Sequence, residues 1–190
     1  MHLVQREKHL EVQTPEYKNI AIVGIGNILQ KDDGIGVTLI KYLEAAYTFP
    51  SHVQLIDGGT SGVALQSQIM HKDFLIIIDA LSISDTPGTV HILNGTSLLG
   101  QSSDIKLSPH QISFFDLLQF MALEKIAPKK IMIMGIVPKD VGCGVELSEP
   151  VKKSIEIAAN QIITQLKQAG IRIEKSTEKI LPNYWWKHKK

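Results

Sequence analysis

The chain has 190 residues, of which 44% are hydrophobic and 21% are charged, a composition typical of one soluble globular domain. Its single cysteine, Cys143, excludes an intrachain disulfide framework and a paired-cysteine zinc site. The net charge is +1, but residues 171–190 carry six basic and two acidic residues. The rest of the chain is therefore mildly acidic, which argues against a nucleic-acid-binding protein.

No apolar stretch approaches the roughly 20 residues that span a bilayer, so we expect no membrane insertion. The first 18 residues carry charges of both signs and no apolar core, unlike a secretory signal, and we expect a cytoplasmic protein. The sequence divides into an N-terminal arm (1–18), an α/β domain (19–170) and a C-terminal basic tail (171–190).

Apolar runs alternate with helical patterns along this domain. The predicted strands are Asn19–Val23, Val53–Ile56, Phe74–Ile78, Thr89–Leu93 and Lys130–Val137. The predicted helices are Gly36–Tyr47, Ser61 to about Met70, Pro109 to about Met121, and a long helix that Ser148 caps and Gly170 ends. This order predicts an α/β fold, a three-layer sandwich in which a twisted, mainly parallel sheet of about five strands carries helices on both faces.

Three polar residues stand where apolar runs stop or a helix begins. Asp33 follows the first strand, Asp79 ends the apolar run FLIII, and His110 follows Ser-Pro at a predicted helix start. Loops at the carboxyl ends of strands converge on one crevice in an open α/β sheet. A helix N-terminus also favours the neutral imidazole that ligates metals. Two carboxylates and one imidazole would form a metal site with open coordination positions. For Asp32 we favour a plain helix N-terminal acid.

Other chemistry is poorly supported. The Gly24-Ile25-Gly26 turn suggests dinucleotide binding, but Leu29 replaces the third glycine of that motif and Asp57 lies too far along the chain. A tight turn that lets the backbone approach a ligand or another loop is the stronger interpretation. The sequence contains no nucleophile elbow, no HExxH zinc helix and no phosphate-binding GxxxxGK[ST] loop.

Taken together, five motifs closely resemble those of the nickel–iron hydrogenase maturation proteases. They are GIGNILQKDDGIG (24–36), LIDGGTSG (55–62), FLIIIDA (74–80), SPHQ (108–111) and MGIVP (134–138). The resemblance implies an α/β sandwich and an endopeptidase that removes a C-terminal peptide from the hydrogenase large-subunit precursor once nickel is inserted. It implies metal contacts and catalytic roles for Asp33, Asp79 and His110. It also implies substrate or metal recognition by Asp57, Gly58 and Gly59.

The donor set suits a borderline divalent ion such as Ni²⁺ or Zn²⁺. The resemblance implies that nickel arrives with the precursor, which would order cleavage after metal insertion. Two alternatives from other classes stay open. A metallochaperone could use the same three residues without cleaving anything, and a Rossmann-type nucleotide-binding enzyme would use Gly24 and Gly26.

Overall fold

The structure is a computed structural model that describes residues 17–95, 109–177, 181–184 and 186, with only the backbone at 109–113. A five-stranded sheet has the order β3-β1-β4-β6-β5. Its strands are β1 (Ile20–Ile25), β3 (Val53–Gly59), β4 (Phe74–Ala80), β5 (Val90–Asn94) and β6 (Lys130–Ile136). Only β5 runs antiparallel to its neighbour, and it forms one edge of the sheet. The predicted mainly parallel sheet is therefore confirmed.

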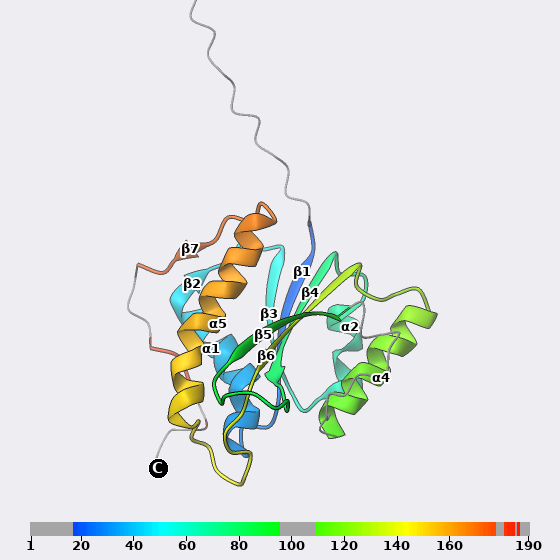
Figure 1. The fold of residues 1–190 in the computed structure, drawn as a ribbon. Coiled ribbons are helices and arrows are strands. Elements are labelled where there is room, and N and C mark those ends of the chain that lie inside the picture. Colours follow the sequence, from blue (N-terminus) through cyan, green and yellow to red (C-terminus); the bar gives the residue numbers. More distant parts are fainter. Residues whose placement is uncertain (1–16, 96–108, 178–180, 185, 187–190) are drawn as a thin grey trace, which may run out of the picture.

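Helices cover both faces of this sheet, as predicted (Figure 1). The long helices α1 (Ile35–Ala46) and α5 (Glu149–Gln168) lie on one face. The other face carries α4 (Pro109–Leu123) and the short α2 (Gln66–Ile69). Among the described residues, no helix is long and apolar enough to cross a membrane.

Strand β4 shows how the sheet separates two apolar cores. All seven of its residues are buried. Phe74, Ile76 and Ile78 pack on the α1 and α5 side, and Leu75 and Ile77 pack on the α4 side. Since side chains alternate along a strand, Asp79 projects to the α4 side.

Two short 3-10 turns and a small ribbon complete the described fold. The turns are η1 (Lys31–Gly34) and η2 (Gly62–Leu65), and the ribbon joins β2 (Tyr47–Thr48) to β7 (Glu174–Lys175). Ile171 and Ile173 are buried in the core of the α1 and α5 side. Residues 171–175 therefore pack on the domain, and the division at Gly170 stays a prediction.

The helix ends differ in part from the sequence expectation. The helix expected from Ser61 is η2 followed by four residues of α2, and the Ser61 side chain makes no capping hydrogen bond. Ser148 precedes α5 as expected, but its hydroxyl donates to Asp32 instead of capping the helix. Gly170 ends α5 as expected: its φ is +79°, its N–H bonds to the Lys167 carbonyl, and the next N–H bonds to Leu166.

Candidate active site

The start of α1 lies directly on the carboxyl ends of two strands. A Cβ atom at Gly36 would stand 2.2 Å from the carbonyl oxygen of Ile25 and 2.4 Å from that of Ile78. Only glycine permits this approach. Asp33 lies less than one turn before Gly36, in η1, which contacts β4. The structure thus brings Asp33 to the carboxyl end of β4, where Asp79 is the second-last residue of the strand.

Asp33 is held in place by the loop that follows β1. Its side chain is 94% buried, and its Oδ2 accepts the Asn27 N–H at 2.8 Å. Gly26 has a φ of +128°, and a Cβ there would lie 1.9 Å from the Asp33 carbonyl oxygen. The Gly24-Ile25-Gly26 turn therefore packs against its own loop, as the tight-turn interpretation expects.

Asp79 is equally enclosed, with 5% of its surface exposed. Its Oδ1 accepts the N–H of Ala80 at 2.7 Å, which fixes the carboxylate at the strand end. In register, Asp79 pairs with Gly135 of β6, so no side chain of the neighbouring strand projects beside it. A carboxylate in this position lies on the sheet face that α4 covers.

The third predicted residue, His110, lies at the start of α4. Figure 1 shows this end of α4 at the edge of the sheet where β4 and β6 finish. Position 110 is one helical turn before Phe114, which is buried against the sheet. The side chain of His110 lies outside the described residues. Among the described side chains, no group of three His, Cys, Asp or Glu is arranged to hold a metal ion.

Asp32 has a structural function that the sequence did not reveal. It is completely buried, and its Oδ2 accepts the N–H groups of Lys139 and Asp140 at 2.9 and 3.0 Å. Ser148 donates its N–H to Oδ1 at 2.7 Å and its hydroxyl to Oδ2 at 2.8 Å. Asp32 thus joins η1 to the loop after β6 and to the start of α5. No local signal predicts this, because all partners lie more than 100 residues away.

The Asp57-Gly58-Gly59 segment ends β3 beside the same loop. The Gly59 carbonyl accepts the Gly26 N–H at 2.8 Å, and Gly59 has a φ of +48°. Asp57 faces α1, where Lys41 Nζ lies 3.9 Å from its Oδ2, and burial raises the pKa of this carboxyl. The segment therefore adjoins the Asp33 loop, with the Asp57 side chain on the α1 side of the sheet.

Comparisons with known proteins identify the family of this chain. Residues 37–165 match a family model described as hydrogenase maturation protease (HycI). The chain belongs to the hydrogenase maturation protease family. It is 35% identical to the hydrogenase 2 maturation protease of Escherichia coli strain K12, over 80% of this chain and 93% of that protein. The sequence resemblance is thus confirmed, and so is the predicted enzyme class: the chain is an endopeptidase of hydrogenase maturation.

Solved structures agree with this assignment. The hydrogenase-maturating endopeptidase HybD of Escherichia coli has a TM-score of 0.77 at 33% identity, covering 84% of this chain and 98% of that one. The [NiFe] hydrogenase maturation protease HybD of Thermococcus kodakarensis has a TM-score of 0.65 at 28% identity, covering 78% and 99%. The α/β fold of the protease is therefore shared with known maturation endopeptidases.

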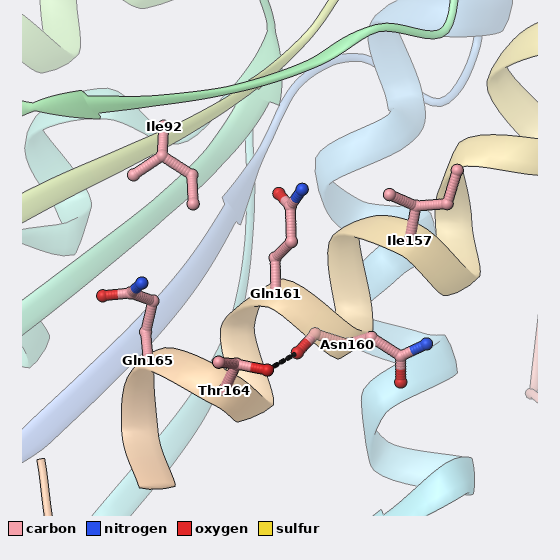
Figure 2. A pocket seen from close by; sticks show the side chains of 6 residues that line it. All are labelled: Ile92, Ile157, Asn160, Gln161, Thr164 and Gln165. Atoms are coloured by element: carbon pink, nitrogen blue, oxygen red, sulfur yellow. Dashed lines mark hydrogen bonds between the residues drawn. The ribbon is translucent and has the colours of Figure 1, made fainter. Parts of the chain in front are cut away.

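The protease also has a surface pocket of about 430 Å³ between β5 and α5 (Figure 2). Its lining residues are Ile92, Ile157, Asn160, Gln161, Thr164 and Gln165. This pocket lies on the α5 side of the sheet, whereas Asp79 faces α4. None of the predicted site residues lines it, so it is separate from the candidate active site.

Proposed function

We propose that this protease removes a C-terminal peptide from the nickel-loaded large-subunit precursor of a nickel–iron hydrogenase, and that Asp33, Asp79 and His110 contact the nickel. The observation that supports the proposal is that Asp33 and Asp79, both buried, lie on two elements, η1 and β4, that contact each other at the carboxyl end of the sheet. Family membership supports the activity, and the geometry supports the choice of residues.

The described residues fit a cation at this edge. Backbone N–H groups of Asn27 and Ala80 each bind one oxygen, at 2.8 and 2.7 Å, and so fix how each carboxylate is turned. Two oxygen donors with a neutral imidazole from His110 suit nickel, with zinc as the ion that could stand in its place.

The ion is best understood as part of the substrate. Resident zinc sites usually have at least three fixed protein ligands, commonly two or three of them His or Cys. This edge of the protease offers two carboxylates and a single His, so it should bind a free ion weakly. It should bind more tightly an ion that the precursor's own ligands already hold. Nickel in the precursor would therefore be recognised, and a precursor without nickel would be left uncut.

The residues of the protease position the precursor for cleavage. Asp33 and Asp79 hold the segment that carries the cation, and their charges offset it. A bound divalent ion can polarise a peptide carbonyl or lower the pKa of a water toward about 7. The Asp57-Gly58-Gly59 segment adjoins the Asp33 loop through the Gly26–Gly59 hydrogen bond, which supports a role for it in binding the precursor beside the metal contacts.

The substitution Asp79→Asn tests this proposal with nickel-loaded precursor as the substrate. The amide keeps the shape of Asp79 but loses the charge that offsets a dication, so we expect no mass decrease of the precursor. A matched control is Asp73→Asn, because Asp73 precedes the opposite end of the same strand and pairs with Lys129 there. The control should cleave at the wild-type rate. Normal cleavage by folded Asp79→Asn protein would leave Asp79 a purely structural residue.

Metal analysis distinguishes the proposed reaction from its rivals. The purified protease should be largely free of metal, yet cut nickel-loaded precursor without added metal and leave nickel-free precursor intact. Efficient cleavage of nickel-free precursor by protein carrying stoichiometric zinc would identify a conventional metalloprotease. Binding of the precursor with no mass decrease would indicate the metallochaperone alternative.

A further inference from the structure

Two exposed apolar side chains lie on loops beside the candidate active site. Leu29 is in the loop after β1, and Val141 is in the loop after β6. Their exposed fractions are 61% and 49%, so much of each side chain stays outside the core. Single exposed apolar residues are common, but apolar surface gathered around a site marks a binding surface. Their position relative to Asp33 therefore decides how they are interpreted.

The turn that carries Leu29 belongs to the loop that holds Asp33. The Asn27 side chain accepts the Leu29 N–H at 3.0 Å, and the Asn27 carbonyl accepts the Gln30 N–H at 2.9 Å. The Asn27 N–H in turn donates to the Asp33 carboxylate at 2.8 Å. The lengths of the bonds between them place the Leu29 Cα no more than about 12 Å from this carboxylate.

Val141 is held against the same loop. The carbonyl of Asp140, the preceding residue, accepts the Asp32 N–H at 3.1 Å. The Asp140 side chain accepts the Gly142 N–H at 2.8 Å, which closes a tight turn around Val141. The Val141 Cα thus lies no more than about 15 Å from the carboxylate of Asp33, the residue next to Asp32.

Hydrogen bonds also join the two loops to each other. Gly144 donates its N–H to the Leu29 carbonyl at 2.9 Å and accepts the Lys31 N–H at 2.9 Å. The Lys31 ammonium pairs with Asp140 at 2.5 Å, and Lys31 has a φ of +44°, which residues other than glycine rarely adopt. The surface that carries Leu29 and Val141 is therefore preorganised, and little ordering is needed when a partner binds.

The size of a protein–protein interface indicates what would cover these side chains. A standard interface buries about 800 Å² on each partner, equal to a disc of about 16 Å radius. A protein that contacts Asp33 through such an interface also covers Leu29 and Val141. The substrate of this protease family is a protein, the hydrogenase large subunit, and it can cover such an area.

We propose that Leu29 and Val141 bind apolar side chains of the hydrogenase large-subunit precursor. These two residues are a docking surface that raises the affinity of the protease for its substrate, and they take no part in bond cleavage. This inference rests on the proposed function, because the proposed function places the precursor at Asp33.

Steady-state cleavage of nickel-loaded precursor by Leu29→Ser and Val141→Ser tests this proposal. Each change removes apolar area that the precursor would cover, so we expect KM to rise about five- to tenfold with kcat within about twofold of wild type. Leu29→Met keeps an apolar side chain and should recover most of the affinity that Leu29→Ser loses.

Leu123→Ser is the matched control, because Leu123 is 82% exposed and is the last residue of α4. The chain just after it reaches the opposite end of the sheet, where the Ile126 carbonyl accepts the His71 N–H before β4 begins. The KM of Leu123→Ser should equal that of wild type.

Three results would overturn the proposal. The first is an unchanged KM in folded Leu29→Ser and Val141→Ser. The second is a fall in kcat at constant KM, because the loop would then act through Asp33. The third is a wild-type dimer that Leu29→Ser dissociates without changing KM, because the surface would then bind a second copy of this chain. Normal cleavage by Asp79→Asn would instead refute the proposed function, so the two failures are distinguishable.

Discussion

Asp32 and Asp33 are adjacent acids with different contacts, and replacing each by Asn should separate stability from activity. Asp32 is completely buried and accepts four hydrogen bonds from Lys139, Asp140 and Ser148. Asp33 accepts the Asn27 N–H, a backbone group only six positions earlier, and lies at the candidate active site. We expect Asp32→Asn to be destabilised but catalytically competent, and Asp33→Asn to be stable but inactive.

The magnitude follows from the atoms involved. In Asp32→Asn the new amide can keep its oxygen at the Oδ2 position, where three donors converge, but its NH2 then faces the Ser148 N–H. That leaves one buried donor unsatisfied and replaces three charge-assisted hydrogen bonds by weaker ones, for a total cost of about 3 kcal/mol. In a domain of this size the melting temperature should fall by about 6–12 °C. For Asp33→Asn the amide oxygen still accepts the Asn27 N–H, so the cost should be about 1 kcal/mol or less.

Both variants are measured by thermal and urea unfolding and by cleavage of nickel-loaded precursor well below the melting point. Asp32→Asn should cleave with a turnover close to that of wild type, and Asp33→Asn should not cleave at all. The reasoning is refuted if Asp32→Asn is as stable as wild type. Equal destabilisation of the two variants would also refute it, since Asp33 would then be a second structural anchor.

Two further predictions concern the ends of the sheet. The Lys129 ammonium and the Lys18 N–H lower the pKa of Asp73. Asp73→Asn should therefore have a lower melting temperature than wild type at pH 7. This difference in melting temperature should shrink as the pH falls from about 4 and vanish below the lowered pKa. Thermal melting of both proteins from pH 7 to pH 3 tests this. Gly36→Ala places a Cβ 2.2 Å from the Ile25 carbonyl oxygen and should cost about 3 kcal/mol in urea unfolding, whereas Gly142→Ala, on an exposed loop, should cost little. Equal stability of the two alanine variants would contradict the close packing of α1 on the strand ends.

Local sequence patterns were sufficient to predict the layers of this fold. The continuous apolar run Phe74–Ile78 is buried on both faces, and the apolar face of α5 packs as its helical spacing predicted. The same patterns failed where a polar side chain had a distant partner. Ser148 is a good capping residue in isolation, but a buried carboxylate 116 positions earlier takes its hydroxyl. Contacts of this kind leave no trace in local periodicity.

The candidate site shows the same division. The placement of Asp33 and Asp79 at the same end of the sheet could be predicted, because the loops after parallel strands converge there, and their role in the reaction stays a prediction. The sequence suggested only a helix N-terminal acid for Asp32, however, and the fold shows that its carboxylate binds the loop after β6.

The C-terminal segment offers a last prediction, in which two truncations should behave differently. Ile171 and Ile173 are 2% and 6% exposed, and β7 pairs with β2 just beyond them. A chain ending at Lys175 keeps these contacts and loses the Ser176 N–H bond to Ala46 and the side chains of Pro182 and Tyr184, which line a pocket with Tyr42. A chain ending at Gly170 loses both isoleucines from the core.

Burial of an isoleucine contributes about 1.5–3 kcal/mol, so ending the chain at Gly170 should cost about 3–6 kcal/mol and lower the yield of folded protein. Ending it at Lys175 should cost about 1–2 kcal/mol, because the described contacts that it removes between this segment and the domain are the Ser176–Ala46 hydrogen bond and the packing of partly exposed side chains. The tail beyond Lys175 lies outside the motifs that carry the family resemblance, so the chain ending at Lys175 should cleave saturating precursor at close to the wild-type rate. A folded chain ending at Lys175 with no turnover would show that residues 176–190 belong to the active site.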